Sequence, residues 1–154
     1  MVCDGYNFRH GYSVGVSRGG KGVAVKNLAK APILTEHQEA CRFSAWLDAH
    51  GYTSTHIANE RKSSAVGIAK LKKEGMKKGF PDYLIMLFYL QKGELKQCMV
   101  FIELKSLKGR ATIEQKQWIS KLDKPENSAA AVCYGAEDAI RFLKICEEKF
   151  KELR

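Results

Sequence analysis

The sequence lacks the paired cysteines that build disulfide frameworks and zinc ribbons. Its five cysteines are odd in number, and no two of them form a CxxC pair. This spacing argues against both a disulfide-rich domain and a zinc module. Free thiols are typical of a reducing compartment, so we expect a cytoplasmic protein.

Long apolar runs and nucleotide-binding loops are also missing. The longest apolar stretch, residues 83–90, is far shorter than the roughly 20 residues that a helix needs to cross a bilayer. No charged segment followed by an apolar run opens the chain, so we expect no signal peptide. The phosphate-binding pattern GxxxxGK(S/T) does not occur, even in the Gly-rich stretch 14–22. We therefore expect neither a membrane segment nor a nucleotide cofactor.

Acidic residues are scarce relative to basic ones. The chain has 26 lysines and arginines against 17 aspartates and glutamates, which gives a formal net charge of +9. Such a balance favours an anionic partner, with nucleic acid first and an acidic membrane surface second.

The chain is long enough for one domain with a proper core, since 45% of its 154 residues are apolar. Residues 1–34 are rich in glycine and basic residues and have little periodicity. They are either a tail or irregular edge strand, or an arm that contacts nucleic acid. The folded domain is expected over residues 35–154.

The hydrophobic pattern of that domain predicts the element order α-β-α-β-β-α-β-α. Two helices begin at capping boxes, formed by Thr35 with Gln38 and by Thr112 with Gln115. The predicted helices cover 35–50, 64–74, 112–122 and 136–153, and the predicted strands cover 52–58, 82–90, 97–105 and 128–134. The turn at Lys92-Gly93 should join the second and third strands into a hairpin.

That hairpin carries the main chemical signal. Side chains alternate between the two faces of a strand, so Glu103 and Lys105 share a face while Ile102 and Leu104 suit a core. If the two strands pair, Asp82 at the start of one lies near Glu103 at the end of the other. Two carboxylates at a strand end make a hard-oxygen site suited to Mg²⁺ or Mn²⁺.

Such a site has the parts needed for phosphodiester hydrolysis. A divalent metal lowers the pKa of a bound water and neutralises charge on a phosphate, and Lys105 can help to orient the water. A simpler interpretation stays open, in which Asp82 closes a turn and Glu103 with Lys105 is an exposed charge pair.

Three further polar residues lie on apolar helix faces. Glu36 and Glu39 share the side of the first helix that carries its apolar stripe, but the helix dipole alone accounts for an acid at Glu36. Gln115 lies in line with the apolar residues of its helix, where it either completes the capping box or fixes a ligand or Lys105.

A run of basic residues, with Glu74 as its one acid, leads into Pro81-Asp82. A solvated helix face is one explanation, and salt-sensitive contact with a phosphate backbone is the other. The candidates for this contact are Arg61, Lys62, Lys70, Lys73, Lys77 and Lys78.

Together these motifs resemble the VRR-NUC nucleases of the PD-(D/E)XK superfamily. The resemblance rests on GFPD (79–82), FIELKS (101–106), Gly109-Arg110 and IEQKQWISKL (113–122), and it extends over about 34–140. It implies a restriction-endonuclease-like α/β fold, a mixed sheet flanked by helices.

The resemblance also implies roles for individual residues. Asp82, Glu103 and the Leu104 carbonyl would be the metal ligands, and Lys105 would be the catalytic lysine. Gln115 would be the motif glutamine. The helix acid would be Glu39 or Glu36, and Glu39 is preferred because the helix dipole explains Glu36 alone.

Stand-alone members of this size look like phage or bacterial proteins and are similar to dimeric Holliday-junction resolvases. We therefore expect a homodimeric, metal-dependent DNA endonuclease, selective for four-way junctions or flaps or acting on plain duplex. A nucleic-acid-binding module without catalysis is the first alternative, and a metal-dependent enzyme for another anionic substrate is the second.

Overall fold

The computed structural model describes residues 32–57 and 65–152, all within the compact unit formed by residues 32–154. Residues 1–31 lie outside the described residues. The predicted arm therefore falls almost entirely outside them, and its boundary at residue 34 stays a prediction.

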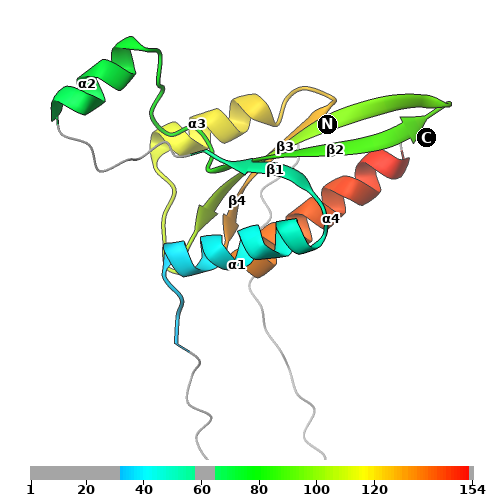
Figure 1. Cartoon of the computed structure of the whole chain (residues 1–154), viewed down its shortest axis with the longest axis horizontal. Helices are drawn as coiled ribbons and strands as arrows, with labels where there is room; N and C mark the ends of the chain where they lie inside the picture. Colours follow the sequence, from blue (N-terminus) through cyan, green and yellow to red (C-terminus); the bar gives the residue numbers. More distant parts are fainter. Residues whose placement is uncertain (1–31, 58–64, 153–154) are drawn as a thin grey trace, which may run out of the picture. The chain divides into compact units, whose positions relative to one another are not determined.

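The predicted order of helices and strands is confirmed (Figure 1). The elements are α1 (Glu36–Ala49), β1 (Thr53–His56), α2 (Ala65–Lys73), β2 (Tyr83–Gln91), β3 (Glu94–Lys105), α3 (Ile113–Leu122), β4 (Ser128–Tyr134) and α4 (Ala136–Glu152). Both predicted capping boxes are present, at the N-termini of α1 and α3.

The four strands form one mixed sheet in the order β1-β2-β3-β4. The β1–β2 and β2–β3 pairs are antiparallel, whereas β3 and β4 run parallel. The hairpin turn places Lys92 at φ 50° and Gly93 at φ 80°, and positive φ at both central residues suits a two-residue hairpin turn. The tight turn fixes the register, so that Tyr83 faces Ile102 at the far end of the hairpin.

The main core lies between the sheet and the helices α1 and α4, which cover one face, while α3 packs on the other (Figure 1). Phe43 and Leu47 of α1 meet Ile85, Val100 and other apolar side chains of the sheet in this core. Phe101 points to the opposite face, where Phe80 packs edge-on against both Phe101 and Trp118. Within the described residues, α2 packs against none of the other elements. None of the helices in this part of the chain is long and apolar enough to cross a membrane.

Candidate active site

The hairpin register brings Asp82 to the end of β3. Tyr83 pairs with Ile102, so Asp82, one residue before β2, lies beside the segment that follows Ile102. Its Oδ2 atom accepts a hydrogen bond from the main-chain N–H of Leu104 at 3.0 Å. Burial raises the pKa of Asp82, although this hydrogen bond opposes the rise. The approach of Asp82 to the ExK segment that the sequence predicts is therefore present.

Glu103 is the most deeply buried acid of the site, with 0% of its surface exposed. Its Oε1 atom accepts hydrogen bonds from Lys105 Nζ at 2.6 Å and from Gln115 Nε2. Its Oε2 atom is buried and has no hydrogen-bond partner among the described residues. Burial raises the pKa of Glu103 to about 7; the bond to Lys105 opposes this shift and the charge of Asp82 adds to it.

Lys105 lies between two carboxylates. Its Nζ atom is 2.6 Å from Glu103 Oε1 and 3.3 Å from Glu36 Oε1, and only 10% of the side chain is exposed. Burial acts to lower the pKa of Lys105, but the hydrogen bond to Glu103 and the nearby negative charges outweigh it and raise the pKa. The side chain is therefore a cation in this arrangement, suited to orienting groups and stabilising negative charge.

The two acids of α1 point to different places. Glu36, in the exposed first turn, contacts Lys105, and its charge also acts on Asp82. Glu39 is buried, and its Oε2 atom accepts from the main-chain N–H of Ala136 at 2.9 Å. The contacts therefore bring Glu36 to Lys105 and Glu39 to the start of α4. The preference for Glu39 as the helix acid stays a prediction.

Gln115 makes two contacts with its side-chain amide, one within the capping box and one with Glu103. Its side-chain oxygen accepts from the main-chain N–H of Thr112 at 2.7 Å, as a capping box requires. Its side-chain nitrogen donates to Glu103. The cap thus fixes the amide that holds the buried carboxylate.

Sequence reasoning missed the contact between α3 and the loop that precedes Asp82. Gly79 has φ 79°, and a Cβ atom at this position would lie 2.9 Å from the main-chain nitrogen of Gln115. Trp118 Nε1 donates to the carbonyl of Lys78 at 3.1 Å. The glycine of the GFPD motif and the tryptophan of α3 were the available signals, but only the fold shows that they meet.

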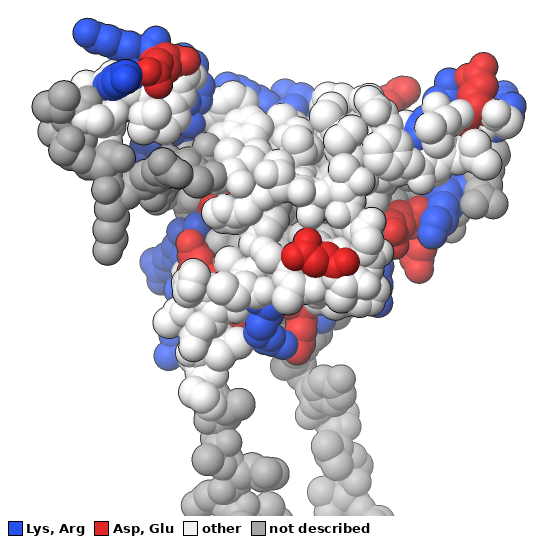
Figure 2. Space-filling model, in the orientation of Figure 1, with Lys and Arg blue, Asp and Glu red and all other residues white. Residues whose placement is uncertain are grey.

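The basic residues named from the sequence are described only in part. Arg61 and Lys62 lie outside the described residues. Lys70, Lys73, Lys77 and Lys78 are exposed. Lys70 pairs with Glu74 at 3.9 Å and Lys78 pairs with Glu114 at 3.4 Å. Figure 2 shows lysines and arginines over several parts of one face, mixed with acids.

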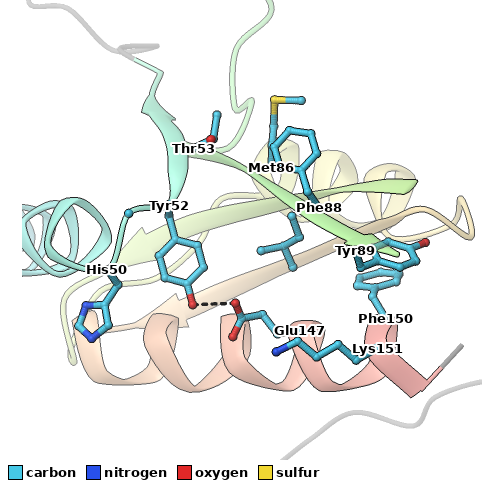
Figure 3. A pocket seen from close by; sticks show the side chains of 11 residues that line it. His50, Tyr52, Thr53, Met86, Phe88, Tyr89, Glu147, Phe150 and Lys151 are labelled. Atoms are coloured by element: carbon cyan, nitrogen blue, oxygen red, sulfur yellow. Dashed lines mark hydrogen bonds between the residues drawn. The ribbon is translucent and has the colours of Figure 1, made fainter. Parts of the chain in front are cut away.

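A hollow elsewhere on the molecule contains none of the predicted site residues (Figure 3). It is lined by residues near the start of β1, along β2 and at the end of α4. Tyr52 donates a hydrogen bond to Glu147 across it at 2.9 Å. Burial, with the negative charge of Glu147, raises the pKa of Tyr52 to about 12.

Two protein carboxylates are available for a metal ion at the candidate site. Across residues 32–57 and 65–152, no three His, Cys, Asp or Glu side chains gather closely enough to hold a metal between them. The donor set nevertheless fits a hard cation, because Mg²⁺ is commonly held by one or two carboxylates together with water and substrate phosphate. The buried Glu103 Oε2 atom, without a hydrogen-bond partner in the described structure, is an available ligand oxygen.

A mixed sheet flanked by helices, with two carboxylates and a lysine at the end of its central hairpin, defines a restriction-endonuclease-like α/β domain. The family model named VRR-NUC domain matches residues 27–137, so the chain belongs to this family of nuclease-type domains. A solved structure described as a VRR_NUC domain protein is similar to this chain, with 25% identity and a TM-score of 0.55. The similarity covers 73% of this chain and 88% of that one. No curated protein sequence matches the chain.

Proposed function

We propose that the protein is a divalent-metal-dependent endonuclease that hydrolyses DNA phosphodiester bonds. The observation that carries the proposal is the trio of part-buried Asp82 and buried Glu103 and Lys105 in a chain of the VRR-NUC family. A domain that only binds nucleic acid has no need to bury a carboxylate next to a lysine, since burying charge is costly.

Asp82 and Glu103, with the Leu104 carbonyl as a further ligand, would hold Mg²⁺ or Mn²⁺. The raised pKa of Glu103 and its Oε2 atom, which lacks a hydrogen-bond partner among the described residues, support this assignment. A cation there would compensate the buried negative charge. When bound, such a metal supplies a water of lowered pKa and neutralises charge on the phosphate.

The other side chains orient these groups. Lys105, protonated and held by Glu103 and Glu36, directs a positive charge at the attacking water and at the charge that develops on the phosphate. Gln115 holds the Glu103 carboxylate in place. We assign Glu36, through its contact with Lys105, as the helix acid of the site.

DNA is the proposed substrate, bound through the exposed basic residues that precede Asp82. Lys70, Lys73, Lys77 and Lys78, with Arg61 and Lys62, would contact phosphates. The proposal extends to a homodimer, which would place two sites about a two-fold axis and suit paired nicks in a branched substrate. We also propose a cytoplasmic location, from the unpaired cysteine pattern of the sequence.

The decisive experiment is cleavage of labelled linear duplex, flap and four-way-junction DNA in the presence of Mg²⁺, Mn²⁺ or EDTA. Wild type is compared with Lys105→Ala and with Lys108→Ala, a matched change of an exposed lysine three residues along the chain. We expect metal-dependent cutting by wild type and Lys108→Ala, and a loss of at least about 100-fold in Lys105→Ala.

The substrates separate the finer parts of the proposal. Symmetric nicks confined to the junction would support the resolvase assignment, and cutting of plain duplex would refute it. If the protein binds all three DNAs but cuts none of them with either metal, it is a nucleic-acid-binding module and not a nuclease.

A further inference from the structure

Helix α1 reaches the end of β3 with two acids from its first turn. Glu36 contacts the side chain of Lys105, as described above. Glu39 reaches the segment between β4 and α4, which lies beside the main chain of Lys105. Helix α1 thus approaches both the side chain and the main chain of Lys105.

The β4–α4 segment links Glu39 to Lys105 through two consecutive main-chain N–H groups. The N–H of Gly135 donates to the carbonyl of Lys105 at 2.8 Å, one step beyond the pairing of Lys105 with Tyr134. The N–H of Ala136, the next residue, donates to Glu39 Oε2 at 2.9 Å. Gly135 adopts φ 87°, and a Cβ atom at this position would lie 3.5 Å from the Glu39 carboxyl group.

We propose that Glu39 is a positioning residue: its buried carboxylate fixes the Gly135-Ala136 turn and, through it, the main chain of Lys105. This inference rests on the proposed function, because the position of Lys105 matters only if Lys105 takes part in cleavage.

The contact is strong enough to serve this purpose. Glu39 is 4% exposed, so its hydrogen bond to Ala136 is shielded from water. A carboxylate is also favoured at the positive N-terminal end of a helix, and Ala136 is the first residue of α4. Arg42, 3.4 Å away, supplies a partial counter-charge from the exposed side. Without the carboxylate, the buried N–H of Ala136 loses its partner and the turn must shift or open.

Variants at position 39 separate a positioning role of Glu39 from two alternative roles, that of a helix cap and that of a charged group of the site. Glu39→Gln keeps an oxygen that accepts from Ala136 and removes the charge, whereas Glu39→Ala removes both. Glu137→Ala is the matched control, because Glu137 also pairs with Arg42 but is 80% exposed and lies outside the contact chain.

The first measurement is hydrogen exchange and chemical shift by NMR on metal-free protein, far below its melting temperature. In Glu39→Ala we expect exchange of the Gly135 and Ala136 amides to accelerate about tenfold or more, with a shift of the Lys105 carbonyl carbon. Glu39→Gln should retain most of the protection, and Glu137→Ala all of it. Unchanged exchange at Gly135 in Glu39→Ala would overturn the inference, whether or not the protein cuts DNA.

The second measurement is cleavage kinetics with Mg²⁺ added, at the same temperature and pH as the NMR measurement. We expect kcat of Glu39→Ala to fall about 10- to 100-fold with KM for DNA unchanged, and Glu39→Gln to recover most of kcat. A lowered melting temperature with unchanged kcat would reduce Glu39 to a helix cap. Equal loss in Glu39→Gln and Glu39→Ala, with a raised Mg²⁺ requirement, would make it a charged group of the site instead. If wild type itself cuts no DNA, the proposed function fails, and the exchange data alone decide whether Glu39 fixes the Lys105 main chain.

Discussion

The two ends of the β2–β3 hairpin differ in what they bury. At the site end (residues 82–86 and 99–105), β1 flanks β2 and β4 flanks β3. At the turn end (residues 87–98), no strand of the described residues flanks the hairpin. Glu103 at the site end is 0% exposed, whereas Phe88 and Leu95 at the turn end are 52% and 70% exposed.

This difference shows that the neighbours of a strand, more than the polarity of its residues, decide which side chains are buried here. At the site end Glu103 and Lys105 are buried and Asp82 is part-buried because strands and helices surround them, and burial raises the pKa values of Asp82 and Glu103. At the turn end Leu87 and Cys98 still reach the core, but Phe88, Leu90 and Leu95 remain in water, where aromatic and aliphatic residues still favour an extended strand.

The two ends of the hairpin should differ most in how a substitution changes cleavage activity. Glu103→Gln should reduce cleavage about 1,000-fold, because it removes the buried carboxylate that the proposed chemistry needs. Glu94→Gln changes the same residue type in the same strand at the turn end, where Glu94 makes an exposed pair with Lys96, and should leave cleavage unchanged. Single-turnover cleavage at saturating protein measures both, and similar losses would show that the two ends are not functionally distinct.

The next effect is on stability. Leu104→Ala should lower the free energy of unfolding by about 2–5 kcal/mol, because Leu104 is 1% exposed and its removal leaves a cavity. Leu95→Ala, also in β3, should change it by less than about 0.5 kcal/mol, because Leu95 is 70% exposed. Urea unfolding followed by circular dichroism gives both values, and a large loss in Leu95→Ala would mean that the turn end is covered in solution.

Two glycines extend the comparison to the backbone. Gly79→Ala should cost about 2 kcal/mol or more, because the residue has positive φ and its new Cβ would press on the main chain of Gln115. Gly93→Ala has positive φ as well, but its Cβ would meet nothing within 4 Å, so a cost of about 1 kcal/mol is expected. Thermal unfolding of the two variants tests this order, which equal costs would contradict.

The smallest effect concerns pH. Tyr52 lines the hollow beside the turn-end residues Leu87, Phe88 and Tyr89, and its pKa is raised from its usual value near 10 to about 12. The folded state therefore favours the neutral phenol, and this contribution is present below pH 10 and lost as pH rises through 12. The difference in stability between wild type and Tyr52→Phe, measured by urea unfolding from pH 9 to 11.5, should shrink with rising pH above 10. A constant difference would argue against the raised pKa.

Much of the fold could be predicted from the sequence because its signals are local. The starts of α1 and α3 each depend on a capping box within four residues, and the hairpin depends on Lys92-Gly93 between two apolar runs. The approach of Asp82 to the end of β3 followed from these local features, since a two-residue turn fixes the register of every pair up to Tyr83 and Ile102.

The remainder of the candidate site depends on contacts between segments far apart in the sequence. Glu36 and Glu39 lie on the same side of α1, and only the position of the β4–α4 turn decides which of them meets Lys105 and which meets Ala136. The close approach of Gly79 to Gln115 likewise follows from the packing of α3 against the preceding loop. Helical periodicity gives the face of a residue but not the partner that this face will meet.

The double role of Gln115 ties the candidate site to the completion of folding. The amide that bonds Glu103 is held in place by the first turn of α3, through the main-chain N–H of Thr112. While α3 is frayed or not yet formed, the Glu103 carboxylate lacks this hydrogen bond and keeps only its contact with Lys105. A nuclease built in this way would reach its full cleavage activity only after α3 has formed. Its activity would then indicate that this part of the domain has finished folding.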